Sequence, residues 1–345
     1  MTYRKAAQLF VVGNSRSGTT MLGRALGRHS NIHTFHELHF FEQQIDAEAI
    51  RARPPQDRER CVALIERLLT SERDSLFSDV RPGKYTDEAR RIAGTLGETS
   101  LMAAYEAFLA SETQHNDKQV SCEQTPRYLY YASEIMRALP DSFVIHMVRD
   151  PRDILLSQKN KWRRRSLGAT NIPRREAVRA WANYHPYITA NLWVSAIRSA
   201  SQVQDHGRIA TLRFEDLVNS PREALQGLCG TLGIEFEEDM LNVPHVGSSI
   251  MVDLQHETGI SSDRSGHWRS GGLTDVEVGI CEYIASREME AAGYRLSGQK
   301  MPKLALMASI SVLAVKTILI LVLNWRRSRN LWEMMSRRLS AMGRA

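Results

Sequence analysis

Strand-like apolar runs alternate with segments of helical spacing along most of this 345-residue chain. Apolar positions with a period of about 3.6 residues resume after each run, as expected of helices that pack on a sheet. Unbroken apolar runs of this length are typical of strands buried on both faces of a parallel sheet. We therefore predict one α/β domain with about five parallel strands flanked by helices. The expected strands lie at residues 8–13, 31–35, 119–124, 143–148 and 208–212.

Residues 42–118 have a mostly helical pattern, broken by Arg-Pro-Pro at 53–55 and by Arg-Pro-Gly at 81–83. This segment is inserted between the second and third predicted strands, where it is well placed to cover a pocket for a substrate. A plain solvated helical bundle is the alternative. We assign residues 1–298 to the α/β domain and residues 299–345 to a hydrophobic and basic helical tail.

The first predicted strand leads into a short polar loop and then a helix. Gly13 and Gly18 allow a tight turn and a close approach of backbone to phosphate oxygens, and helix N-termini favour anions. The Gly-x4-Gly spacing matches that of a Walker A loop, so a P-loop-like arrangement of strand, loop and helix is expected. However, Thr19 stands where a Walker A loop needs Lys. Arg16 suits a 5′-phosphate that bears one further anionic group. The expected anion-binding residues are Arg16, Ser17, Gly18, Thr19 and Thr20.

A second phosphate element is expected after the buried run at 143–148. Arg149 ends that run, and Ser157 follows about two helical turns later. An Arg fork and a hydroxyl can clamp one phosphate. The alternative is structural, with Arg149 paired to Asp150 or Asp153 to close a strand–helix turn.

A candidate general base follows the second predicted strand. Glu37 leaves the carboxyl end of that strand among three histidines and two phenylalanines, and apolar neighbours raise the pKa of a carboxyl group. A helix-capping role for Glu37 is the alternative. His36 and His39 are the other candidates for a base, although a wall position is expected for them. No metal site is predicted.

Several of these segments are similar to motifs of the sulfotransferases that use 3′-phosphoadenosine-5′-phosphosulfate (PAPS), of the bacterial or tyrosylprotein type. Ser-Arg-Ser-Gly-Thr-Thr at 15–20 resembles their 5′-phosphosulfate loop. Val-Arg-Asp-Pro-Arg-Asp-Ile-Leu-Leu-Ser at 148–157 resembles their 3′-phosphate element, and Glu-Gln-Thr-Pro-Arg at 123–127 their Thr-Pro element. Weaker likeness extends the match over about residues 8–296.

The resemblance implies transfer of a sulfonate group from PAPS to an acceptor hydroxyl of a carbohydrate, lipid or small molecule, by in-line displacement. It makes Glu37 the base and places Arg16 at the transferring group, with Arg149 and Ser157 on the 3′-phosphate. Gln124 departs from the pattern, because many relatives have Lys before Thr-Pro. The loop at 261–266 also departs from the pattern, because it lacks the Arg-Lys-Gly triplet of cytosolic relatives.

Two other functions stay open from the sequence. A P-loop kinase or NTPase would use the same loop, although the Walker Lys is missing. A non-catalytic, membrane-associated nucleotide-binding protein would retain the fold, and Gln124 is compatible with it.

Charge and cysteine content bear on location and partners. Residues 300–345 hold nine Lys and Arg against one acid, whereas the remainder has 36 basic and 38 acidic residues, a net charge of −2. Residues 304–323 reach the ~20 residues of a membrane span, but Lys316 interrupts them. We expect the tail to associate with an anionic membrane surface rather than span the membrane. Docking of the tail on the domain, or on a second copy in a homodimer, is the alternative.

Four scattered cysteines and an early first strand predict a cytoplasmic protein without a signal peptide, and no nucleic-acid partner is expected.

Overall fold

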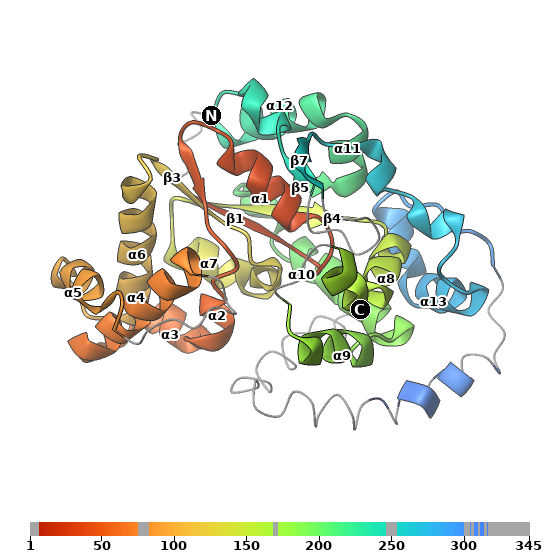
Figure 1. Cartoon of the computed structure of the whole chain (residues 1–345), viewed down its shortest axis with the longest axis horizontal. Coiled ribbons are helices and arrows are strands. Elements are labelled where there is room, and N and C mark those ends of the chain that lie inside the picture. The colour runs from red at the N-terminus through yellow and green to blue at the C-terminus, as the bar shows by residue number, and fades with distance from the viewer. Residues whose placement is uncertain are drawn as a thin grey trace.

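The computed structural model describes residues 7–74, 83–167, 172–245 and 254–299, together with 304, 307–309, 311–313 and 316. Its central sheet has five parallel strands in the spatial order β2-β3-β1-β4-β5 (Figure 1). The predicted α/β fold with about five parallel strands is therefore confirmed. The strands are β1 (Gln8–Gly13), β2 (Ile32–Thr34), β3 (Val120–Glu123), β4 (Ser142–Val148) and β5 (Ile209–Arg213).

Strand β1 lies in the middle of the sheet, and its side chains alternate between two hydrophobic cores. Leu9 and Val11 belong to the core that contains residues of α1 (Thr19–Gly27), α11 (Phe214–Asn219) and α12 (Pro221–Leu232). Phe10 and Val12 belong to the core formed with the helices of the insertion. Because successive side chains of a strand point to opposite faces, a strand that serves two cores must be apolar at every position.

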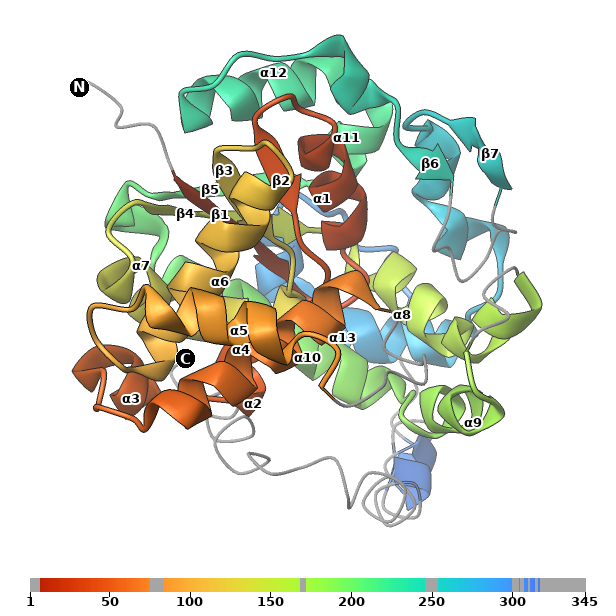
Figure 2. The same ribbon diagram turned by 60° about the vertical axis from the view of Figure 1, so that its left-hand side comes forward.

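The insertion between β2 and β3 is helical, as predicted, and the helices α2 to α6 lie together on one side of the sheet (Figures 1 and 2). The predicted break at 53–55 separates α3 from α4, while residues 81 and 82 of the second break lie outside the described residues. The helices are α2 (Phe40–Gln43), α3 (Ala47–Ala52), α4 (Arg58–Arg73), α5 (Thr86–Gly94) and α6 (Leu101–His115). After β3, the 3₁₀ helix η1 (Pro126–Tyr131) and α7 (Ala132–Ala138) complete this side.

Strand β4 leads directly into α8 (Pro151–Lys159), which begins three residues before the predicted start at 154. Asp150 caps this helix by accepting a hydrogen bond from the N–H of Arg152, and Pro151 occupies the first turn, where its missing N–H carries no penalty. The 3₁₀ helix η2 (Lys161–Leu167), α9 (Arg174–Ala182), α10 (Pro186–Ser201) and the 3₁₀ helix η3 (Gln204–His206) follow. A third core joins α8 and α10 to α13 (Asp275–Ala291).

The segment between α12 and α13 is built from short elements. The two-stranded antiparallel pair β6 (Pro244–His245) and β7 (Leu254–Thr258) is separate from the main sheet. Three 3₁₀ helices complete the segment: η4 (Glu238–Leu241), η5 (Ser262–Arg264) and η6 (His267–Ser270). Thr274 and Glu277 form a capping box that starts α13.

The described part of the tail contacts the junction of α9 and α10. Lys316 Nζ donates to the carbonyl oxygen of Tyr184 at 3.0 Å and lies 5.1 Å from the ring centre of Trp181. His185 Nε2 hydrogen-bonds the carbonyl oxygen of Ser309 at 3.0 Å. Lys316, which interrupts the apolar run, therefore attaches this part of the tail to the domain. Most of residues 304–323, and the basic segment after them, lie outside the described residues. Within the described residues, no helix is both long and apolar enough to cross a bilayer.

Candidate active site

Residues 14–18 form a tight loop between β1 and α1, and two glycines at its ends have positive φ values. Gly18 is the N-cap residue of α1 with φ at 98°, and a Cβ there would lie 2.4 Å from Cδ2 of Phe214. Gly13 has φ at 156°, and a Cβ there would lie 2.5 Å from the carbonyl oxygen of Met147. Because non-bonded atoms do not approach so closely, any other residue would push the loop away from β4 and α11.

The first turn of α1 faces this loop without a side-chain cap, since its N-cap residue is Gly18. The N–H of Met21 donates to the carbonyl oxygen of Gly18 at 3.0 Å, whereas the N–H groups that begin such a turn have no partner within a helix and attract an anion together with the helix dipole. Ser17 contributes differently: its Oγ and its N–H both donate to the carbonyl oxygen of Asn14, at 2.7 and 3.1 Å. The buried Ser17 therefore holds the loop in shape. Thr19 is buried and Thr20 is half-buried.

Arg16 joins the loop to α8. Its Nε donates to Oγ of Ser157 at 2.9 Å, across 141 residues of sequence. The backbone of Arg16 has φ at 77°, a conformation that non-glycine residues rarely adopt and that must be held by its surroundings. The two predicted phosphate elements, one at 15–20 and the other at 148–157, are thus in direct contact.

Arg149 connects three segments at the end of β4. Its Nη1 donates to the carbonyl oxygen of Arg16 at 3.2 Å and its Nη2 to that of Arg264 at 2.8 Å, while the guanidinium lies 4.2 Å from the ring centre of Phe214. Burial lowers the pKa of this guanidinium, and the charge of Asp153 among nearby carboxylates opposes the shift. Among the described residues no carboxylate forms an ion pair with Arg149, and its Nε has no hydrogen-bond partner.

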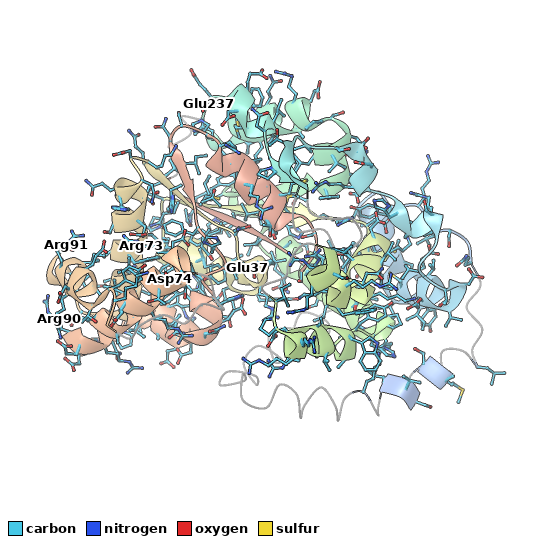
Figure 3. All side chains as sticks on the ribbon, in the orientation of Figure 1. Glu37, Arg73, Asp74, Arg90, Arg91 and Glu237 are labelled. Atoms are coloured by element: carbon cyan, nitrogen blue, oxygen red, sulfur yellow. The ribbon has the colours of Figure 1, made fainter. Side chains whose placement is uncertain are left out.

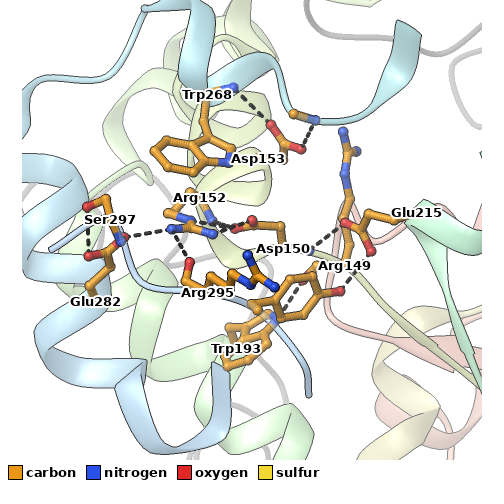
Figure 4. Close-up of polar contacts among 12 residues, drawn as sticks. Arg149, Asp150, Arg152, Asp153, Trp193, Glu215, Trp268, Glu282, Arg295 and Ser297 are labelled. Atoms are coloured by element: carbon orange, nitrogen blue, oxygen red, sulfur yellow. Dashed lines mark hydrogen bonds and ion pairs between the residues drawn. The ribbon is translucent and has the colours of Figure 1, made fainter. Parts of the chain in front are cut away.

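The carboxylates of the same motif have other partners (Figure 4). Asp150 pairs with Arg152 at 2.7 Å, and Arg152 also pairs with Glu282 at 2.7 Å and stacks on the ring of Trp268. Asp153 accepts the N–H groups of Gly266 and Trp268, at 2.6 and 3.0 Å. The strand–helix turn is therefore closed by the pair of Asp150 with Arg152, and Asp153 holds the loop that carries Arg264.

Glu37 lies between the helical insertion and the helices that follow β4 (Figure 3). Its side chain is 40% exposed, and its Oε2 is 3.5 Å from Nε2 of His39. The expected apolar surroundings are thus replaced by a polar, half-open setting. His36 is turned toward Glu72, which accepts its backbone N–H at 2.9 Å and lies 3.4 Å from its Nδ1. Among the described residues, no group of three or more His, Cys, Asp and Glu side chains is arranged to hold a metal ion.

The family comparison decides between the functions left open by the sequence. A family model described as the sulfotransferase family matches residues 8–238, which is more than half of the chain. This chain belongs to the sulfotransferase family. Both the resemblance seen in the motifs and the prediction of a sulfonate-transferring enzyme are confirmed. Comparison with curated proteins found no match.

Solved sulfotransferase domains have the same fold. The domain from the Synechococcus PCC 7002 olefin synthase is 18% identical, with a TM-score of 0.51, over 86% of this chain and 98% of that one. The domain from the curacin biosynthetic pathway is also 18% identical, with a TM-score of 0.50, over 85% and 99% of the two chains.

Two buried polar groups of this sulfotransferase lie at the end of β3, and no role was predicted for the first of them, Glu123. Glu123, at the end of β3, accepts hydrogen bonds from the N–H of Leu38 and from Oγ1 of Thr125, while its Oε2 has no partner among the described residues. Burial raises the pKa of Glu123 to about 8. Gln124 is also buried, and its Oε1 has no partner in the described structure. The Thr-Pro motif marked this segment, but no local pattern showed that Glu123 would be enclosed.

Proposed function

We propose that the sulfonate donor of this enzyme is PAPS and that the acceptor presents a hydroxyl group. The observation that carries this proposal is the contact of the two phosphate elements: Arg16 donates to Ser157, and Arg149 donates to the backbone of Arg16. A donor with anionic groups at both its 5′ and 3′ positions fits two adjoining cationic elements. The resemblance in the motifs supplies the same assignment.

The hydrogen-bond inventory supports the role given to each side chain. Ser157 Oγ accepts from Arg16, so its own hydrogen is available to donate to a 3′-phosphate. Arg149 has five N–H donors, of which two are directed at carbonyl oxygens, and its charge faces no paired carboxylate in the described structure. In our proposal the first turn of α1 and Arg16 bind the 5′-phosphosulfate, with Gly18, Thr19 and Thr20 lining it and Ser17 holding the loop.

The reaction in this proposal is an in-line displacement at sulfur. The acceptor oxygen forms a bond to sulfur as the bond from sulfur to the 5′-phosphate oxygen breaks, and 3′,5′-adenosine bisphosphate leaves. The acceptor proton passes to Glu37. As in phosphoryl transfer, the protein contributes chiefly by positioning the reactants and neutralising charge. The helical insertion at 42–118 covers the acceptor site in this arrangement.

Calorimetric titration with 3′,5′-adenosine bisphosphate, 5′-AMP and Mg-ATP tests the donor assignment. We expect the bisphosphate to bind roughly tenfold to a hundredfold more tightly than 5′-AMP, since each charge-assisted contact to the 3′-phosphate contributes about 1.5–3 kcal/mol. Arg149→Gln should remove most of that preference. Equal affinity for the bisphosphate and 5′-AMP would exclude the 3′-phosphate clamp.

We further propose a cytoplasmic location, with the basic C-terminal segment held near an anionic membrane surface. The supporting observations are the charge of that segment and the docking of Ser309 and Lys316 on the domain, which would keep the attachment close to α9 and α10. A second copy of the chain is the other partner that this surface could hold.

A further inference from the structure

The segment that follows β2 alternates between buried and partly exposed side chains. Leu38 and Phe40 are buried, whereas the side chains of Glu37 and His39 are 40% and 26% exposed. The backbone between them is anchored in the core, because the buried Glu123 accepts the N–H of Leu38 at 3.0 Å. Glu37 and His39 thus share the open side of an anchored segment, and their side chains meet there.

His39 places one ring nitrogen against each of two carboxylates. Its Nε2 is 3.5 Å from Oε2 of Glu37, and its Nδ1 is 3.5 Å from Oε1 of Glu42. The backbone of His39 has φ at 54°, a conformation that few non-glycine residues adopt and that is enriched at functional sites. The ring therefore links the candidate base to a second carboxylate three residues further along the chain.

Glu42 is the fixed end of this series of contacts. It is 6% exposed, and its Oε2 accepts a hydrogen bond from Nη1 of Arg127 at 3.1 Å. Burial by itself would raise the pKa of Glu42, but the hydrogen bonds and charges of His39 and Arg127 outweigh burial and hold that pKa below its usual range. Glu42 is therefore a buried negative charge beside His39, and such a charge stabilises an imidazolium.

We propose that His39 and Glu42 are positioning residues that orient Glu37 and accept its proton. The Nδ1–H of His39 donates to Glu42, which leaves the lone pair of Nε2 facing Glu37. The acceptor proton passes first to Glu37 and then to Nε2, so that Glu37 becomes a carboxylate again and the imidazolium lies between two carboxylates. The partly exposed ring then releases the proton to water. This inference rests on the proposed function, because it takes Glu37 as the base.

The test removes the ring of His39 and then supplies imidazole from solution. Glycine adopts positive φ without strain, so His39→Gly leaves a space for a free imidazole with the main chain unchanged. Turnover should fall by about tenfold to a hundredfold, less than the full effect of a general base, while the affinity for 3′,5′-adenosine bisphosphate changes little. Added imidazole should restore most of this turnover. It should restore none in Glu37→Gln, which lacks the base that His39 serves.

Two further variants separate this role from a purely structural one. His39→Asn suits the same backbone conformation and keeps a donor toward Glu42, but it has no nitrogen that can take a proton, so it should lose as much turnover as His39→Gly. Glu42→Gln removes the charge that stabilises the imidazolium and should lower turnover about tenfold with bisphosphate binding retained. His36→Ala is the matched control.

Three results would overturn the proposal. They are full turnover in His39→Asn, full turnover in Glu42→Gln, and a loss in His39→Gly that imidazole does not restore although the variant binds the bisphosphate. Failure of the wild-type protein to bind the bisphosphate would instead refute the proposed function.

Discussion

Two arginines of one motif, three residues apart, have opposite surroundings. Arg152 is enclosed by two carboxylates, from Asp150 and Glu282, so its charge is neutralised inside the protein. Arg149 donates to backbone carbonyl oxygens, which are neutral acceptors. A buried charge without a counter-ion is costly, and it is kept where a ligand supplies the opposite charge. This difference separates the candidate ligand-binding arginine from the structural one. The sequence Arg-Asp-Pro-Arg-Asp alone does not show which of the two arginines is paired with carboxylates.

At Glu37, the change to test is Glu37→Gln. If Glu37 accepts the acceptor proton, turnover should fall by about 10²–10⁴, since an amide cannot act as a base. The affinity for 3′,5′-adenosine bisphosphate should change little. Both are measured on one preparation, as release of the bisphosphate with a hydroxyl acceptor and as a calorimetric titration.

The neighbouring histidines provide the controls for Glu37. His36→Ala removes a ring that is directed at Glu72, so it should leave turnover nearly unchanged. His39→Ala removes the group 3.5 Å from Glu37 and should have an intermediate effect. A larger loss in His39→Ala than in Glu37→Gln would move the base to His39. Weak donor binding with normal turnover at saturation would make Glu37 structural.

Glu123 should make the stability of the protein depend on pH. Its pKa is raised by burial from 4.5 to about 8. Between these two pH values the carboxyl group is protonated in the folded state and ionised in the unfolded state. Stability is fully present below that range and is lost as pH rises through it. From pH 6.5 to 8 we expect the free energy of unfolding of the wild-type protein to fall by about 1–2 kcal/mol, and Glu123→Gln to flatten that slope.

The chosen pH window separates Glu123 from His146. Burial lowers the pKa of His146 to about 4, so its contribution changes below pH 6.5 and in the opposite direction, with stability lost as pH falls. His36, whose pKa is raised by its hydrogen bond to Glu72, also titrates in this window, so the carboxyl group is isolated by the difference in slope between the wild-type protein and Glu123→Gln at pH 6.5, 7.25 and 8. An unchanged slope in Glu123→Gln would mean that Glu123 is ionised in the folded protein.

Among the elements, the segment from η5 to η6 depends on one carboxylate of α8. Asp153 accepts two backbone N–H groups of this segment, at Gly266 and Trp268, and the segment presents the carbonyl oxygen of Arg264 to Arg149. A short segment with little regular structure keeps its position through such contacts. The orientation of Arg149 is thus linked to a loop 115 residues away.

Asp153→Ala should therefore weaken the binding of 3′,5′-adenosine bisphosphate about tenfold and that of 5′-AMP much less. The free energy of unfolding should fall by about 1–3 kcal/mol, because two partly buried N–H groups lose their acceptor. Hydrogen exchange at 262–268 should become faster in the same variant. Asp87→Ala changes a fully exposed aspartate and is the control for the loss of one negative charge. Equal losses for both nucleotides would indicate a general effect on the fold.

How far the sequence predicts each element depends on how local its cause is. The five strands were predicted because burial on both faces leaves an unbroken apolar run, and the start of α1 because Gly18 and Thr19 mark a turn. The apolar residues at 154–156 place the start of α8 three residues late, because the helix begins at Pro151 with Asp150 as its N-cap, ahead of any apolar period. Strand β6 has two residues, Pro244 and His245, too few to show any period.

The candidate site follows the same rule. Its loop, Arg149 and Ser157 were chosen from local motifs, and the structure brings these segments into contact. The connection of Arg16 to Ser157, and that of Asp153 to the loop at 266–268, could not be predicted. These contacts join residues more than 100 positions apart, and no local pattern specifies such a partner.

For the whole molecule, the division into domain and tail leads to a prediction about a chain that ends at residue 299. It should stay folded and bind 3′,5′-adenosine bisphosphate normally, because the candidate site residues all precede the tail. The full chain should sediment with anionic vesicles, more weakly at high salt since charge is screened and apolar burial is not. The shortened chain should not sediment with them, and neutral vesicles are the control. Lys316→Ala, which loses the contacts to Tyr184 and Trp181, separates docking from membrane binding. Aggregation of the shortened chain would instead place the tail in the core or in an oligomer interface.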